Sequence, residues 1–286
     1  MKRDFLSILD INAKELMFIL GQAVKLKKER ANKRWLDRKT LVMIFEKPSL
    51  RTKLSFSIGM TQLGGNAVYM GPTEIGLGSR EPVKDIAAVT GSMADVIMAR
   101  TFKHETVVEM AKYSAVPVIN GLSDREHPCQ IMADLLTIFE IKKKLKGLKV
   151  CYIGDCANNV AQSLALACKM IGIEFALCGP KNYGGQIENP KAAVHGADVI
   201  YTDTWVSMGD EQEKEERLKA FRRYQVTPEL MKLAKRDAIF MHDLPAYRGN
   251  EVSANVIDGP QSVIYQQAEN RLHAQKAILL FLLWKI

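Results

Sequence analysis

Residues 45–52 read Phe-Glu-Lys-Pro-Ser-Leu-Arg-Thr and directly follow the apolar run Leu-Val-Met-Ile at 41–44. The apolar run predicts a buried strand, which the Pro-Ser pair at 48–49 would end. Apolar residues then recur at helical spacing, which predicts a helix over residues 50–63. This strand–turn–helix unit sets the pattern for the rest of the chain.

Ser49, Arg51 and Thr52 are expected at the N-terminus of that helix. Free N–H groups and the positive end of the helix dipole favour an anion there. Two hydroxyl groups and a guanidinium would complete a cradle for a phosphate group. The alternative is a plain N-cap, because a serine before a helix often caps it and has no further role.

Strand and helix patterns alternate along almost the whole chain. This alternation is typical of parallel sheets covered by helices on both faces, so we expect an α/β fold. The chain divides into two α/β domains near residue 143, and an amphipathic closing helix could pack back on the first domain. Strands are expected at 41–45, 67–70, 96–99, 116–119, 148–153, 175–178, 199–202 and 239–241. Helices are expected at 13–28, 50–63, 83–93, 105–113, 128–143, 159–171, 211–221 and 265–284.

Composition limits the possible partners. The 286 residues are 47% hydrophobic and 25% charged, as in ordinary globular proteins, and the net charge is +8. Because no basic stripe is interleaved with aromatic residues, nucleic acid is disfavoured, and a modest positive field suits small anionic substrates. The longest apolar stretch, 277–284, is too short to cross a bilayer, so we expect no membrane partner.

The cysteines and histidines limit the compartment and the cofactors. Five cysteines, an odd number without a CxxC pair, favour a reducing compartment, which we interpret as the cytoplasm. The N-terminus shows no hydrophobic segment of a signal peptide. The five histidines have no metal-ligand spacing, so no metal site is expected. Residues 154–159 lack the GxGxxG turn, which argues against a dinucleotide cofactor.

Polar residues follow several predicted strands. In open α/β sheets, ligands bind at these carboxyl ends. The strand-end groups are Ser49 to Thr52, Arg100 and Thr101, Asn120, Gly154 and Asp155, Asp203, and His242 and Asp243.

The candidates at strand ends and on helices each have a plainer interpretation as well. Arg100 is either a ligand contact or a solvated rim charge. His127 could donate to a carbonyl oxygen or simply cap a helix. Asp203 could hold an ammonium group or favour the helix that follows it. Arg271 lies on the closing helix, where an exposed side chain is the default expectation.

The order of the motifs is more specific than any one of them. FEKPSxRT, ARTF, VINGLSDxxHPCQ, GDxxNNV, DTWVSMG, HxLPA and AENR follow one another between residues 40 and 275. This series resembles the aspartate/ornithine carbamoyltransferase family. HPCQ marks the wider family, and DxxxSMG is similar to the ornithine-binding loop of its ornithine branch.

The resemblance implies two doubly wound parallel-sheet domains bridged by helices. Residues 1–143, joined by the C-terminal helix 265–286, would bind carbamoyl phosphate, and residues 144–264 would bind ornithine. It implies a homotrimer with active sites at subunit interfaces, and transfer of a carbamoyl group to the δ-amine of L-ornithine, with citrulline and phosphate as products. No metal or organic cofactor is implied.

The resemblance also implies a set of site residues. Arg100, His127, Thr52 and Asp243 would be catalytic. Contacts to carbamoyl phosphate would come from Ser49, Leu50, Arg51, Thr52, Arg100, His127, Gln130, Asp243, Leu244 and Arg271. Contacts to ornithine would come from Asn159, Asp203, Ser207 and Met208.

The chain departs from the family pattern at several positions. Leu50 stands where the family usually has Thr, Lys53 where it has Arg, and Asp243 where it has Cys. Gly76 stands where many bacterial members have a Gln that reaches the neighbouring subunit. The stretch 179–190 is about one helix shorter than expected, either because the chain has lost it or because a piece is missing from the sequence.

Two rival functions stay open. One is a carbamoyltransferase for a different amine, with Asp243 marking the change. The other is a relative that binds carbamoyl phosphate but has lost catalysis.

Overall fold

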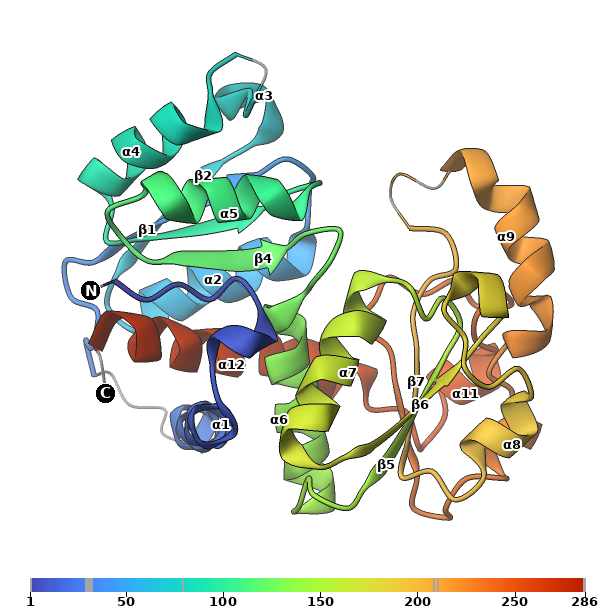
Figure 1. Cartoon of the computed structure of the whole chain (residues 1–286). Helices are drawn as coiled ribbons and strands as arrows, with labels where there is room; N and C mark the ends of the chain where they lie inside the picture. The colour runs from blue at the N-terminus through green and yellow to red at the C-terminus, as the bar shows by residue number, and fades with distance from the viewer. Residues whose placement is uncertain (1, 29–32, 79, 208, 210, 285–286) are drawn as a thin grey trace. The chain divides into compact units, whose positions relative to one another are not determined.

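The computed structural model describes residues 2–28, 33–78, 80–207, 209 and 211–284. The chain forms two compact units (Figure 1). Unit 1 contains Met1–Leu136 and Glu269–Ile286, and unit 2 contains Thr137–Ala268. The boundaries fall inside two helices, α6 (Pro128–Lys142) and α12 (Ile264–Trp284).

Unit 1 is built on a four-stranded parallel sheet in the order β2-β1-β3-β4. Its strands are β1 (Thr40–Phe45), β2 (Asn66–Met70), β3 (Val96–Arg100) and β4 (Val118–Leu122). Phe45 pairs with Arg100 at the carboxyl ends of β1 and β3. The turn that follows β1 therefore starts beside Arg100.

Apolar helices cover this sheet. On one face, α4 (Val83–Met93) and α5 (His104–Tyr113) pack Ile86, Val107 and Met110 against β1, β3 and β4. Figure 1 shows α2 (Leu50–Gln62) on the opposite face. The remaining elements of unit 1 are η1 (Ile8–Asp10), α1 (Ala13–Lys28) and α3 (Pro72–Ile75).

Unit 2 repeats the architecture with the strand order β6-β5-β7-β8, again parallel. Phe221, Tyr224, Phe240 and Trp205 belong to its core. The strands are β5 (Lys149–Ile153), β6 (Glu174–Cys178), β7 (Val199–Thr202) and β8 (Ile239–Met241). The helices are α7 (Asn159–Ile171), η2 (Lys181–Tyr183), α8 (Pro190–Val194), η3 (Glu211–Glu213), α9 (Lys214–Phe221), η4 (Arg222–Tyr224), α10 (Pro228–Met231) and α11 (Ala254–Ile257).

The predicted α/β fold with two parallel sheets is confirmed, and most differences lie at the ends of elements. The predicted strand 116–119 in fact runs over Val118–Leu122. The polar Asn120 suggested an end to the strand, but its backbone N–H donates to the Phe5 carbonyl oxygen at 2.8 Å, and the strand continues. Helices α3, α8, α10 and α11 have four or five residues, too few to show a helical period.

The closing helix differs from its prediction in character. It was expected to be amphipathic, but residues 273–279 are all buried, with Gln275 and Lys276 among them. Lys276 Nζ donates to Gln62 Oε1 of α2 at 2.8 Å. A partner on another helix therefore satisfies the buried ammonium group of Lys276. Both polar side-chain atoms of Gln275 are buried and have no hydrogen-bond partner among the described residues.

The short stretch after β6 closes as a compact glycine turn. Gly185 N donates to Pro180 O at 3.1 Å, and Gly179 N donates to Ile187 O at 3.2 Å. A Cβ atom on Gly185 would lie 2.0 Å from the Gly179 oxygen, so this position requires glycine.

Within the part of the chain that the structure describes, every helix is too short or too polar to traverse a lipid bilayer.

Candidate active site

The N-terminus of α2 is organised by Ser49. Its Oγ accepts from Thr52 N at 3.3 Å and donates to Thr52 Oγ1 at 3.0 Å. Ser49 therefore caps the helix, as the plainer interpretation held. The cap also holds two hydroxyl groups at the positive end of the helix dipole, so capping and anion binding are compatible here.

Arg271 brings three helices of unit 1 together. The side chain is only 2% exposed, so the default expectation of an exposed helical arginine is wrong. Nη1 donates to Gln130 Oε1 of α6 at 2.6 Å, and Nη2 donates to Thr52 Oγ1 of α2 at 3.0 Å. Gln130 Nε2 in turn donates to Asp134 Oδ1 at 2.9 Å. This network fixes the guanidinium beside the helix cap.

His127 lies just before α6 and is 3% exposed. Burial lowers its pKa well below the usual value, and the charges of Arg271, Arg100, Lys47 and Arg51 lower it further. The imidazole is therefore neutral at pH 7, and it is surrounded by cations. A neutral imidazole can donate one hydrogen bond to an oxygen without adding charge.

Leu50 and Lys47 belong to the first motif, and each contributes to the site in a different way from the hydroxyl groups and the arginine. Leu50 is the first residue of α2, and its side chain is 69% exposed, so its backbone N–H is what it can offer an anion. Lys47 contributes to the cation cluster around His127, although the sequence analysis assigned it no role. Its place in the motif FEKPSxRT could have indicated a role. The spacing of residues in a turn, however, does not predict where the lysine side chain points.

Asp203 is the central acid of unit 2. It follows β7 and is buried. Oδ1 accepts from Thr204 N at 2.6 Å, and Oδ2 accepts from Asn158 Nδ2 at 3.2 Å. Asn158, which the sequence analysis did not assign to the site, also caps α7. Asn159, which it did assign, is the first residue of that helix.

Asp203 and Asp243 form a close carboxylate pair. Burial raises the pKa of Asp203 well above its usual range, and the charge and hydrogen bond of Asp243 raise it further. Two neighbouring carboxylates cannot both ionise without cost, so the pair holds a proton or attracts a cationic ligand.

His242 lies beside this pair. Its Nδ1 accepts from Leu244 N at 2.9 Å, so the hydrogen-bond pattern assigns the proton to Nε2, which lies 3.4 Å from Glu251 Oε1. Ligand atoms of Asp203, His242 and Asp243 lie within 4.8 Å of one another. Because the Nδ1 lone pair already accepts the Leu244 amide, the cluster suits an ammonium group better than a metal ion.

The other strand-end residues have different surroundings. Asp155 forms a buried ion pair with Arg217, and Asn120 Nδ2 donates to Leu6 O at 2.9 Å. Both side chains therefore hold the fold together. Ser207 is half-buried on the segment after β7, Leu244 adopts a φ of 63°, and Met208 lies outside the described residues.

Two family models together match almost the whole chain. The carbamoyl-P binding domain of aspartate/ornithine carbamoyltransferase matches residues 3–140, and the Asp/Orn binding domain matches residues 146–282. The chain belongs to the aspartate/ornithine carbamoyltransferase family.

Similar members of the family come from diverse organisms. An ornithine carbamoyltransferase of Methanosarcina acetivorans is 48% identical and is aligned over 99% of this chain and 100% of its own length. The ornithine carbamoyltransferase structure from Pyrococcus furiosus has a TM-score of 0.95 at 46% identity, covering 100% of this chain and 98% of that one. The structure of the anabolic ornithine carbamoyltransferase from Campylobacter jejuni subsp. jejuni has a TM-score of 0.93 at 40% identity, and the match covers 100% of both chains.

The alignment with the Methanosarcina relative spans 302 positions, whereas this chain has 286 residues. The relative therefore carries residues without a counterpart here.

Proposed function

We propose that this protein transfers the carbamoyl group of carbamoyl phosphate to the δ-amine of L-ornithine, giving L-citrulline and phosphate. The observation that carries the proposal is the group of four cations around the neutral His127, next to the capped N-terminus of α2. This chemistry matches a phosphate bonded to a reactive carbonyl. The family membership and the names of the similar proteins support the same reaction.

The phosphate end of carbamoyl phosphate is assigned to unit 1. Ser49, Arg51 and Thr52 supply two hydroxyls and a guanidinium, and the backbone N–H of Leu50 adds a donor. Arg271 is already oriented toward the cap by its hydrogen bonds to Thr52 and Gln130. As phosphate leaves, its negative charge grows, so these donors stabilise the departing group.

The carbonyl end is assigned to Arg100, His127 and Thr52. When the amine attacks, negative charge develops on the carbonyl oxygen, and preorganised donors lower the barrier. A neutral His127 and a charged Arg100 can both donate to that oxygen.

Ornithine is assigned to unit 2. Asp203 would accept its α-ammonium group, and Asn159, Ser207 and Met208 would contact the rest of the amino-acid end. The buried acid with a raised pKa supports this assignment, because a cation is what removes the cost of ionising it.

Asp243 is assigned to the reacting end, with Leu244. The δ-amine must lose a proton before its lone pair attacks the carbonyl carbon. A new C–N bond then forms, the C–O bond to phosphate breaks, and phosphate leaves with the bonding electrons. Asp243 would orient the amine and accept its proton.

The family membership also supports proposals for the domain roles, the oligomeric state and the compartment. The domain of residues 1–143 with helix 265–286 would bind carbamoyl phosphate, and the domain of residues 144–264 would bind ornithine. A homotrimer in the cytoplasm is the proposed state. Five buried cysteines, all free, support a reducing compartment.

A coupled assay tests the proposal. Purified protein is given carbamoyl phosphate with L-ornithine, putrescine, L-lysine or N-acetyl-L-ornithine, and both the ureido product and phosphate are measured. Citrulline formation with ornithine at least tenfold preferred supports the proposal. Preference for another amine would favour the rival function, a carbamoyltransferase for a different amine. Binding of carbamoyl phosphate without turnover on any amine would favour a non-catalytic relative.

A further inference from the structure

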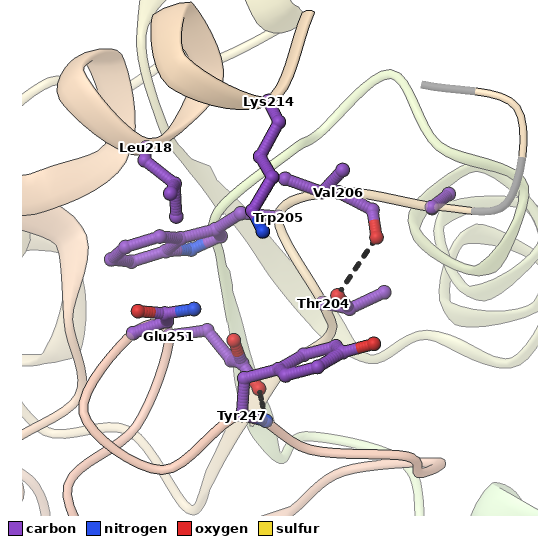
Figure 2. A pocket seen from close by; sticks show the side chains of 9 residues that line it. Thr204, Trp205, Val206, Lys214, Leu218, Tyr247 and Glu251 are labelled. Carbon is purple, nitrogen blue, oxygen red and sulfur yellow. Dashed lines mark hydrogen bonds between the residues drawn. The ribbon is translucent and has the colours of Figure 1, made fainter. Parts of the chain in front are cut away.

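A small pocket lies within unit 2, against the segment that follows Asp203. Its volume is about 210 Å³, and residues 204–207, α9 and residues 247–251 line it (Figure 2). This volume is below the range of sites for drug-sized ligands. An occupant would be a small metabolite.

A buried acid faces this pocket. The Glu251 side chain is 1% exposed. Oε1 accepts from Tyr247 N and lies 3.4 Å from His242 Nε2. Oε2 is buried and has no hydrogen-bond partner among the residues that the structure describes. A buried acceptor without a donor is costly, so a donor from a ligand would be stabilising.

A lysine side chain lines the pocket on the side opposite Glu251. Figure 2 shows the Lys214 side chain reaching from α9 toward Trp205. Lys214 forms no ion pair with Glu251 among the described contacts, although both line the same cavity. One negative and one positive group therefore face the pocket, with the Trp205 and Tyr247 rings on its walls.

We propose that this pocket binds a small α-amino acid through its zwitterion, with the ammonium group on Glu251 Oε2 and the carboxylate on Lys214. A phosphate or simple carboxylate would leave Glu251 facing an anion, and a simple amine would leave Lys214 without a counter-charge. The aromatic walls favour the ammonium end. Thr204 and Asn250 add polar groups, and Leu218 and Val206 leave an apolar side for a short side chain.

Occupancy would act on the proposed ornithine site, and this part of the inference rests on the proposed function. Thr204 lines the pocket and donates its amide to Asp203 Oδ1 at 2.6 Å, while its hydroxyl donates to Val206 O at 3.1 Å. A ligand in contact with this segment would restrict its movement. Because such coupling is reciprocal, an amino acid in the pocket would change the KM for ornithine, and ornithine would change affinity in the pocket.

Calorimetry with L-alanine tests the binding. Acetate and methylamine, each carrying one charged end, serve as matched probes and are expected to bind at least tenfold more weakly. Lys214→Gln should weaken L-alanine at least tenfold, because a charge-assisted contact is lost. Lys219→Gln, on the same helix and outside the pocket, should change nothing. Equal affinity in wild type and Lys214→Gln would overturn the proposal.

A second variant separates this pocket from the proposed ornithine site. Asp203→Asn should retain L-alanine binding within about threefold if the pocket is the site. If Asp203→Asn abolishes binding and Lys214→Gln preserves it, L-alanine occupies the ornithine site and the inference is wrong. Carbamoyl-transfer activity is measured separately on the same proteins. Absence of turnover would end the proposed function, whereas the binding result would stand.

Discussion

The two units each bury a histidine, but the charges around the two are opposite. His127 in unit 1 lies among Arg51, Arg100, Arg271 and Lys47. His242 in unit 2 lies between two carboxylates. Its Nδ1 is 3.8 Å from Asp243 Oδ1, and its Nε2 is 3.4 Å from Glu251 Oε1. Burial and the surrounding cations lower the pKa of His127, whereas His242 accepts a backbone amide on Nδ1 and faces two carboxylates.

This difference shows how similar sheets can hold different ligands. Both units place their candidate residues after the carboxyl ends of parallel strands, as open α/β sheets do. The fold therefore positions both sites but does not choose their charge. The side chains after each strand do so, cationic in unit 1, where we propose phosphate binding, and anionic in unit 2, where we propose binding of an ammonium group.

The largest effect is expected from the cations of unit 1. Arg100→Ala should lower turnover about a hundredfold or more, because one donor to the developing oxyanion is lost. Arg51→Ala should lower turnover and also raise the KM for carbamoyl phosphate. Steady-state kinetics at varied carbamoyl phosphate separate the two effects. Turnover within about twofold of wild type would remove that arginine from the site.

The acid of unit 2 should affect the other substrate. Asp203→Asn is expected to weaken ornithine by about 10- to 100-fold, since a charge-assisted contact to the α-ammonium is lost. Carbamoyl phosphate binding, measured by calorimetry, should stay nearly unchanged. If both substrates weaken equally, the division of charge between the units does not correspond to a division of substrates.

His127 makes a prediction about stability. Its folded pKa is lowered, so below the unfolded value of about 6.5 the unfolded chain binds a proton that the folded chain does not. The free energy of unfolding is therefore highest above that pH. It decreases as the pH falls, by up to about 1.4 kcal/mol per pH unit. Urea unfolding at pH 7, 6 and 5 measures the slope. His127→Gln should have a shallower slope than wild type, and identical slopes would contradict a neutral His127.

The smallest change is expected in the position of a pH profile, at Asp243. A carboxylate beside the δ-amine stabilises its ammonium form and raises its pKa, which moves the rise of activity to higher pH. Asp243→Cys and Asp243→Asn should move the pH profile of turnover down by about one unit, with ornithine still the substrate. Rates at saturating substrates from pH 6 to 10 test this. Superimposable profiles would mean that Asp243 does not contact the reacting amine.

Local patterns in the sequence were sufficient to predict the framework. Apolar runs and helical spacing located the strands and the longer helices of both units, because those signals depend on neighbours in the chain. Ser49 as a helix cap was predictable for the same reason. The succession of motifs also identified the family, which the comparisons confirmed.

Other features depended on contacts between distant residues. Arg271 meets Thr52 across 219 positions, so its burial has no local signal. The roles of Lys47, Asn158 and Glu251 likewise come from elements that fold together. Spacing determines which face of an element a residue occupies. Only tertiary packing determines what that face meets, and with it the burial and neighbouring charges that set the chemistry of the site.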